Sequence, residues 1–324
     1  MESLSDLLKQ WRGGGAISER TEKKVAELMA DPLVAKLRMK HPELDEHAIR
    51  LNLNRVYQYV KEYRQCSACP GLDRCPNDLE GHYTLLSFEG GAGGPAQLVD
   101  RKVACKKLLA RRNEERIRSR IRSFYMDDRA LRQGYSADEI LTADLKRSEA
   151  VGRILRYIDK TKAEGLQQEG LYLAGHFGTG KTFLMCYMLH ELAKAGYSGI
   201  IVYMPEFVED LKSMLNEPGR LRETVELMKQ TDLLVFDDIG AENLNPWVRD
   251  HVLGPILNYR MERKPTFYTS NYDLDALERH FSFTNRDGDE LHKGQRLMDR
   301  IRPFVEPVTV NGENKRWRKD RTAD

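Results

Sequence analysis

The sequence predicts an α/β fold: a parallel sheet with helices on both faces, preceded by a small helical zinc-binding domain. Three observations predict it. In residues 171–310, short apolar runs alternate with stretches of helical periodicity. A glycine-rich loop follows the first of those runs and precedes a long helical pattern. In the front half, three cysteines fall within ten residues.

The alternation in the C-terminal half predicts where each strand of the sheet and each covering helix lies in the sequence. The strands are expected at 171–174, 199–204, 232–238, 265–271 and 305–310. The helices are expected at 140–157, 181–194, before 229, and around 247–260. The segment 183–189 is apolar nearly all round, which favours a buried helix, and Cys186 within it is interpreted as a core residue.

The glycine-rich loop is Gly-His-Phe-Gly-Thr-Gly-Lys-Thr, over residues 175–182, and it fits the pattern of a phosphate-binding loop. Glycines let successive backbone N–H groups point at a phosphate, and the positive end of the following helix adds to the attraction. Lys181 is expected to reach the β and γ oxygens, and the Thr182 hydroxyl to bind Mg²⁺. The predicted ATP-binding residues are Gly175, Gly178, Thr179, Gly180, Lys181 and Thr182.

Polar side chains at the ends of two later strands are of the types that ATP hydrolysis requires. Asp237 and Asp238 end one apolar strand, where open α/β sheets bind their ligands. Asp237 suits a Mg²⁺ contact, and Asp238 suits the orientation or deprotonation of an attacking water. Asn271 ends the next strand and would hold that water or sense the γ-phosphate; alternatively, it only begins the turn before Asp273.

Composition limits the class of protein. The chain has 324 residues, enough for about two domains. Charged residues make up 31% but the net charge is only +2, so nucleic-acid binding would have to come from local patches. The first residues lack a basic and apolar leader pattern, and no apolar run approaches a membrane span. We expect a soluble, cytoplasmic protein with no membrane partner.

The cysteine cluster predicts a structural zinc site. Cys66, Cys69 and Cys75 are followed by His82, and a Cys-x2-Cys spacing lets two thiolates share one metal. A closed Cys₃His shell would stabilise a small domain. Cys105 is the reserve fourth ligand, and the alternative is that the three are reduced cysteines in a polar loop.

The segments around the cysteines define the front domain, residues 1–104. Before Cys66, one amphipathic helix is expected from five residues spaced by three or four: Ile49, Leu53, Val56, Val60 and Tyr63. After His82, residues 83–89 and 97–104 flank a glycine cluster and predict a hairpin.

A basic linker is expected over 105–135, before an ATPase domain over 136–324. Residues 101–122 hold ten basic and two acidic residues, a local excess of eight positive charges. They are either an arm for a phosphate backbone or acidic partner surface, or a solvated helical connector.

Four strings together resemble one known family. They are the phosphate-binding loop, Leu-Leu-Val-Phe-Asp-Asp-Ile-Gly, Tyr-Thr-Ser-Asn, and Gly-Gln-Arg-Leu-Met-Asp-Arg-Ile. The chain resembles the AAA+ ATPases of the DnaC and DnaI type, the bacterial replicative helicase loaders, and with the cysteine module in front it is most similar to the DnaI type. The resemblance implies an AAA+ P-loop core with a minimal lid, in which the strand ending at Asn271 lies between the P-loop and Asp-Asp strands.

The resemblance also implies partners and further site residues. The front domain would grip the hexameric replicative helicase, while the ATPase domain would self-associate and contact single-stranded DNA during replication initiation or restart. Arg300 would be an arginine finger supplied to a neighbouring subunit, with Arg296 in support, and Arg316 would contact nucleotide in its own subunit. Alternatively, Arg296 and Arg300 lie on a solvated basic helix face.

Departures from the pattern leave other functions open. Asp238 stands where many AAA+ enzymes have a longer Glu, so hydrolysis is expected to be slow. About two dozen residues follow Arg300, too few for an appended DNA-binding domain of the DnaA type. The alternatives are an IstB-like transposition helper, a nucleotide-gated adaptor without useful hydrolysis, or a zinc protein with a vestigial P-loop. A DNA surface is suggested at Lys212, Arg220 and Arg222.

Overall fold

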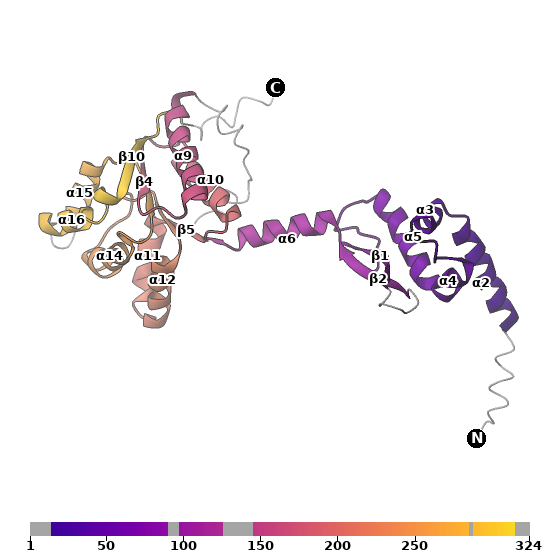
Figure 1. Cartoon of the computed structure of the whole chain (residues 1–324). Helices are drawn as coiled ribbons and strands as arrows, with labels where there is room; N and C mark the ends of the chain where they lie inside the picture. The colour runs from indigo at the N-terminus through magenta and orange to yellow at the C-terminus, as the bar shows by residue number, and fades with distance from the viewer. Residues whose placement is uncertain (1–13, 90–96, 126–144, 285–287, 315–324) are drawn as a thin grey trace, which may run out of the picture. The chain divides into compact units, whose positions relative to one another are not determined.

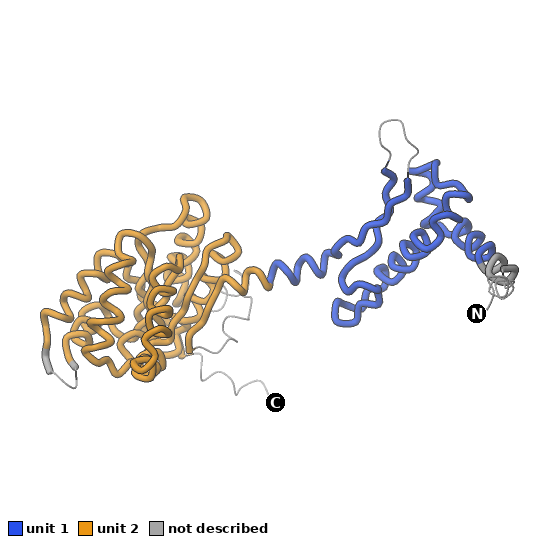
Figure 2. The backbone as a smooth tube through the Cα atoms, turned by 90° about the horizontal axis from the view of Figure 1, so that it is seen from below, with its two compact units in different colours: residues 1–114 blue, residues 115–324 orange. Residues whose placement is uncertain are grey.

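The structure is a computed structural model, and it describes residues 14–89, 97–125, 145–284 and 288–314. The chain divides into two compact units, residues 1–114 and 115–324, which Figure 2 draws in blue and orange. Each unit has its own core, so each is described separately.

Unit 1 is built from helices packed on a two-stranded hairpin (Figure 1). Its helices are α2 (Gly14–Met29), α3 (Pro32–Lys40), α4 (Glu46–Leu51) and α5 (Leu53–Ser67). Two are capped by aspartates: Asp31 accepts a hydrogen bond from the Leu33 N–H, and Asp45 accepts one from the Ala48 N–H. The core consists of apolar side chains from all these elements: Val25, Leu28, Val34, Leu44, Ile49, Val56, Val60, Leu86 and Leu98.

The helix predicted before Cys66 is interrupted. α4 ends at Leu51 and α5 begins at Leu53, with Asn52 between them at φ −115° and ψ 28°. The Asn52 side chain donates to the Ala48 carbonyl oxygen at 2.9 Å. This bond offers the backbone an alternative to helix continuation, which explains the break that apolar spacing alone missed. Tyr63, expected on the buried face, is 51% exposed.

The hairpin predicted after the cysteines is confirmed. β1 (His82–Glu89) pairs antiparallel with β2 (Gln97–Ala104). The fully buried Glu62 of α5 attaches it to the helices, because its carboxylate accepts hydrogen bonds from the Thr84 N–H and hydroxyl. Lys102 of β2 donates to the same carboxylate, so the buried charge is compensated.

Unit 2 contains the predicted parallel sheet, in the order β10-β4-β7-β6-β5-β3. Its strands are β3 (Ile121–Phe124), β4 (Gly170–Ala174), β5 (Gly199–Tyr203), β6 (Leu233–Asp237), β7 (Thr266–Ser270) and β10 (Val305–Thr309). A short antiparallel pair, β8 (Phe283–Thr284) and β9 (Gly288–Asp289), lies outside it. β7 lies between β4 and β6, as the family resemblance implied.

Helices cover both faces of this sheet (Figure 1). One face carries α9 (Ser148–Glu164) and α10 (Lys181–Lys194). The other face carries α11 (Met204–Met214), α12 (Pro218–Gln230), α13 (Pro246–Val248), the π-helical turn η3 (Arg249–Leu253), α14 (Gly254–Arg260), α15 (Leu274–Ser282) and α16 (Leu291–Met298). Alternate residues of a central strand serve the two cores: Leu234 and Phe236 face one, and Leu233 and Val235 the other. Short 3₁₀ turns are η2 (Leu145–Arg147) and η4 (Arg302–Phe304).

The predicted linker, 105–135, is different in the structure. Residues 106–118 form α6 (Lys106–Arg118), and β3 then pairs with β5 as the edge strand of the sheet. The parallel sheet of unit 2 therefore begins at Ile121, before residue 136. Residues 126–144 lie outside the described part of the chain.

No helix in the part of the chain that the structure describes combines the length and apolar character needed to cross a bilayer.

Candidate nucleotide-binding site

The phosphate-binding loop lies between β4 and α10 and has the backbone that its glycines permit. Gly178 has φ +74° and Gly180 has φ +94°, in the left-handed region that favours glycine. A side chain at Gly175 would approach the Val310 carbonyl oxygen to 2.4 Å. The loop can therefore curl and lie close to the end of β10 only with glycine at these positions.

Lys181 is held over this loop by three oxygen acceptors. Its Nζ donates to the carbonyl oxygens of Gly175 and His176, at 2.8 and 3.0 Å, and to Asn271 Oδ1 at 2.8 Å. The last bond links the loop to the end of β7. The ammonium group is therefore oriented in advance at the place where the motif predicts phosphate oxygens.

The two predicted Mg²⁺ ligands are in direct contact. Thr182 Oγ1 donates to Asp237, at 2.8 Å from Oδ1 and 3.1 Å from Oδ2. Thr269 Oγ1 donates to the same carboxylate at 2.7 Å. Burial, together with the neighbouring Asp238 charge, raises the pKa of Asp237 to about 6, despite these hydrogen bonds. A buried carboxylate beside a hydroxyl is an oxygen donor set that fits Mg²⁺.

Asp238 is oriented by an unusual backbone conformation. It has φ +56°, where a residue other than glycine is uncommon, and its N–H donates to Thr269 Oγ1 at 2.9 Å. Asn271 Nδ2 donates to Asp238 Oδ1 at 3.0 Å. Asn271 thus touches Lys181 with one side-chain atom and Asp238 with the other. Hydrogen bonds thus join Lys181 to Asn271, Asn271 to Asp238, and Thr182 to Asp237, while the catalytic roles of these residues stay predictions.

Two further residues lie against the loop and carried no sequence motif. Arg147 is 3% exposed, and its Nη1 donates to the Thr179 carbonyl oxygen at 3.5 Å. A Cβ added to Gly180 would lie 2.6 Å from that Nη1, and one added to Gly178 would lie 2.0 Å from Asn314 Oδ1. Only the fold reveals these neighbours, because they are distant from the loop in sequence.

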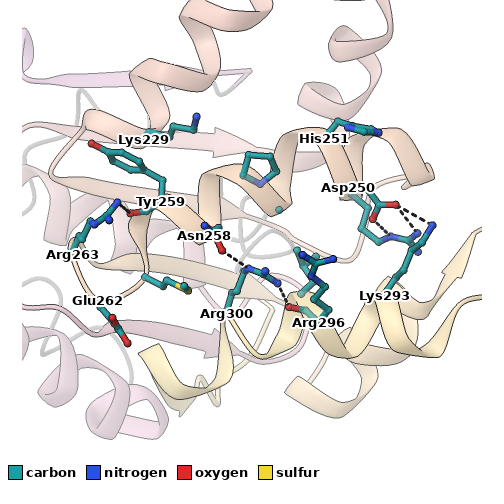
Figure 3. Close-up of a pocket in the computed structure, with 15 residues that line it drawn as sticks. Lys229, Asp250, His251, Asn258, Tyr259, Glu262, Arg263, Lys293, Arg296 and Arg300 are labelled. Atoms are coloured by element: carbon teal, nitrogen blue, oxygen red, sulfur yellow. Dashed lines mark hydrogen bonds and ion pairs between the residues drawn. The ribbon is translucent and has the colours of Figure 1, made fainter.

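The predicted arginines line a different part of unit 2. Arg296 of α16 and Arg300 just after it border a groove of about 830 Å³ beside α14 (Figure 3). No residue of the loop 175–182 borders this groove. The structure therefore does not bring the predicted arginines and the phosphate-binding loop into one groove. Arg316 lies outside the described residues.

The zinc site is not supported. Within the described ranges, no three side chains of His, Cys, Asp or Glu are grouped as a metal ion requires. His82 Nδ1 lies 2.8 Å from the Glu80 carbonyl oxygen, and Asn77 Nδ2 donates to Cys66 Sγ at 3.3 Å. A hydrogen bond from the Gly71 backbone, and Lys107, lower the pKa of Cys69. The structure therefore does not group Cys66, Cys69, Cys75 and His82 as a zinc site. Cys186 is buried, as expected, and burial raises its pKa to about 12.

Two of the side chains suggested to contact DNA, on α11 and α12, form ion pairs with neighbouring carboxylates. Lys212 pairs with Glu209 at 2.6 Å, and Arg220 lies 3.4 Å from Asp210. These pairs reduce the positive charge available to a phosphate backbone, so the suggested surface stays a prediction.

The comparisons with known proteins agree with this geometry. The family described as "Primosomal protein DnaI N-terminus" matches residues 1–92, and the family described as "IstB-like ATP binding protein" matches residues 125–323. The replicative helicase loader DnaI of Bacillus subtilis is 33% identical over 318 residues, covering 98% of this chain and 99% of that protein.

This chain belongs to the DnaI family. A crystal structure of DnaI is 37% identical in sequence to this chain, with a TM-score of 0.50. The match covers 62% of this chain and 99% of the chain in that crystal structure. The ATP-binding protein assigned to insertion sequence IS1162 of Pseudomonas fluorescens is 29% identical over 59% of this chain and 78% of that protein. The matches confirm that the C-terminal unit has the P-loop fold of an ATP-binding family.

Proposed function

We propose that this DnaI-family chain is a slow ATPase that binds the replicative DNA helicase and delivers it onto single-stranded DNA. The observation that carries the proposal is the hydrogen-bonded series from Lys181 through Asn271 to Asp238. It links the phosphate-binding group to the candidate water-orienting group across two adjacent strands. A simple phosphate-binding fold would not need that link.

Each part of the site then has a defined task. Lys181 contacts the β and γ oxygens of ATP, and the left-handed glycines direct N–H groups at the same phosphates. Thr182 and Asp237 would hold Mg²⁺, which supplies neutralising charge at the transferred phosphoryl group. Asp238 orients the attacking water, and Asn271 keeps that carboxylate in place. The short side chain of Asp238 favours slow turnover.

Two of the arginines that line the groove complete this site from a second copy of the chain. Arg300 is the candidate finger and Arg296 the supporting residue, and neither forms an ion pair with a carboxylate among the described residues. A guanidinium that is not already neutralised can stabilise charge on a neighbour's γ-phosphate. Self-association through the ATPase domain is therefore part of the proposal, and Arg316 is assigned to nucleotide contact in its own subunit.

A loading assay tests the proposal. Purified full-length chain, replicative helicase, ATP and single-stranded DNA are mixed, and DNA-bound helicase is measured. Lys181→Ala is expected to abolish ATP-dependent delivery. Lys194→Ala, at the other end of the same helix and paired with the partly buried Glu191, is the matched control and is expected to leave delivery intact. Equal delivery by the Lys181→Ala protein and the parent would refute the proposal.

The nucleotide-gated adaptor is the main competing function. An adaptor would use ATP binding but not hydrolysis, so Asp238→Asn would leave helicase delivery unchanged. A loader that depends on turnover would accumulate a stalled complex with this variant. The match of residues 1–92 to the DnaI N-terminal family favours a helicase partner over transposition, although the IstB-like match covers the ATPase unit.

Zinc binding by Cys66, Cys69 and Cys75, with His82 or Cys105 as fourth ligand, remains a separate hypothesis within this proposal. Metal analysis of the purified chain tests it directly. Stoichiometric zinc that is lost in a Cys69→Ser variant would support it, and metal-free folded protein would refute it. We also propose that the chain acts in the cytoplasm with the helicase and DNA, because it belongs to the DnaI family.

A further inference from the structure

One side of the groove is formed by α14, and this helix is anchored to the segments that lead into the central sheet. Arg260, the last residue of α14, is 1% exposed. The three nitrogens of its guanidinium donate to a ring of oxygens on the adjoining segments: the carbonyl oxygens of Met228, Lys229, Thr231, Asp232 and Pro265, and the hydroxyl of Thr266. Because these segments lead into β6 and β7, α14 is attached rigidly to the strands that carry Asp237 and Asn271.

Asn258 lies on the outer face of this anchored helix. Its neighbours in sequence, Ile256 and Leu257, are buried, while Asn258 itself is exposed to the groove. Its Oδ1 accepts a hydrogen bond from Arg300 Nε at 3.2 Å (Figure 3). Arg300 Nη1 also donates to the Arg296 carbonyl oxygen. The guanidinium is therefore held from two sides by neutral oxygens.

We propose that Asn258 is a positioning residue for the finger Arg300, and that it fixes the guanidinium from α14 for use at a neighbouring subunit's nucleotide. This inference rests on the proposed function. A flexible arginine must lose side-chain freedom when it meets a phosphate, and a fixed one has lost it already. A neutral amide suits this task, because it orients the guanidinium without cancelling the charge that the phosphate requires.

Arg263 supplies a matched control within the same groove. Its Nη1 donates to the Tyr259 carbonyl oxygen at 3.2 Å, and its guanidinium lies 5.1 Å from the Tyr259 ring centroid. Among the described residues, no hydrogen bond or ion pair joins Arg263 to Arg300, so Arg263→Ala removes a charge from the groove without removing a hydrogen bond of the finger. Asn258→Ala removes no charge and leaves the buried core untouched.

The test measures ATP turnover by the full-length chain at several protein concentrations, with Mg²⁺ and single-stranded DNA. Asn258→Ala is expected to lower kcat by about 10- to 100-fold, the cost of a misplaced catalytic group, with an unchanged KM for ATP. Arg263→Ala should match the parent. Mixing equal amounts of Asn258→Ala and Lys181→Ala should raise turnover to about a quarter of the parent's, because about a quarter of the interfaces then combine an intact loop with an intact groove.

The outcomes separate this inference from the proposed function. If Arg300→Ala loses turnover and is rescued by Lys181→Ala, but Asn258→Ala turns over like the parent, the positioning role is wrong and the trans site stands. A loss in Asn258→Ala that Lys181→Ala cannot rescue would also overturn the positioning role. If Arg300→Ala has no effect and parent turnover per subunit is independent of concentration, the trans site itself fails.

Discussion

Replacing Asp237 with asparagine should stabilise the nucleotide-free protein while disabling its use of Mg²⁺. Burial raises the pKa of this carboxyl to about 6 from an ordinary value of 3.8. Its ionised form is therefore disfavoured in the folded state by about 3 kcal/mol at pH 7.5. Asparagine keeps an oxygen that accepts from the hydroxyls of Thr182 and Thr269, and it carries no charge.

The sign of the pH dependence follows from the raised pKa. Between pH 3.8 and about 6 the folded carboxyl holds its proton while the unfolded one has lost it, so the parent loses stability as pH rises through this window. The advantage of Asp237→Asn should therefore be about 3 kcal/mol at pH 7.5 and only about 1 kcal/mol near pH 4.5.

Urea denaturation without nucleotide, followed by circular dichroism at these two pH values, measures the effect on the C-terminal unit. Adding Mg²⁺ and ATP should stabilise the parent by mass action and leave Asp237→Asn nearly unchanged. An asparagine variant that is less stable than the parent at pH 7.5, or equally favoured at both pH values, would refute the reasoning about burial.

Three further changes test other parts of the chain. Glu62→Gln should destabilise unit 1 by about 2 kcal/mol in thermal unfolding, because Thr84 loses a charged acceptor. Burial alone would raise the pKa of Glu62, but its hydrogen bonds lower that pKa overall. The stability advantage of the parent over the variant should therefore decrease as the pH falls and the carboxylate is protonated. Gly294→Ala should displace α16, because the new Cβ would lie 2.0 Å from Ser282 Oγ and 2.8 Å from its backbone nitrogen; ATP binding should persist while concentration-dependent turnover falls. Asp238→Asn should retain ATP affinity in calorimetry and lose turnover by about 10²- to 10⁴-fold, since asparagine tolerates the left-handed backbone; unchanged turnover would exclude Asp238 as the group acting on water.

The elements that the sequence predicted well are those with a strong local pattern. The helix predicted over 181–194 matches α10 at both ends, because a left-handed glycine precedes it and its apolar residues are buried on most sides. The hairpin of unit 1 was predicted from two runs around a glycine cluster. In both cases adjacent residues contain the information, so no distant contact is needed to place the element.

The elements that were missed depend on distant contacts. β3 has only four residues, Ile121–Phe124, within a strongly basic stretch, and its pairing with β5 makes it a strand. Arg147 precedes the phosphate-binding loop in sequence and Asn314 follows it, yet both lie against the loop in the fold. Neither residue belongs to a motif. Asn258 resembles any polar residue on a helix surface until the fold brings Arg300 next to it.

Two asparagines make the same kind of contact in this arrangement. Asn271 contacts Lys181 and Asp238, and Asn258 contacts Arg300, so in each case a neutral amide holds a charged group for which we propose a role at phosphate or water. A carboxylate at either position would form an ion pair and weaken the charge needed for phosphate. When Lys181 turns to a phosphate oxygen, Asn271 Oδ1 becomes available to the attacking water while Nδ2 still holds Asp238. Nucleotide binding would thereby prepare the water-orienting side of the site, and hydrolysis would then wait for the neighbour's preoriented arginine.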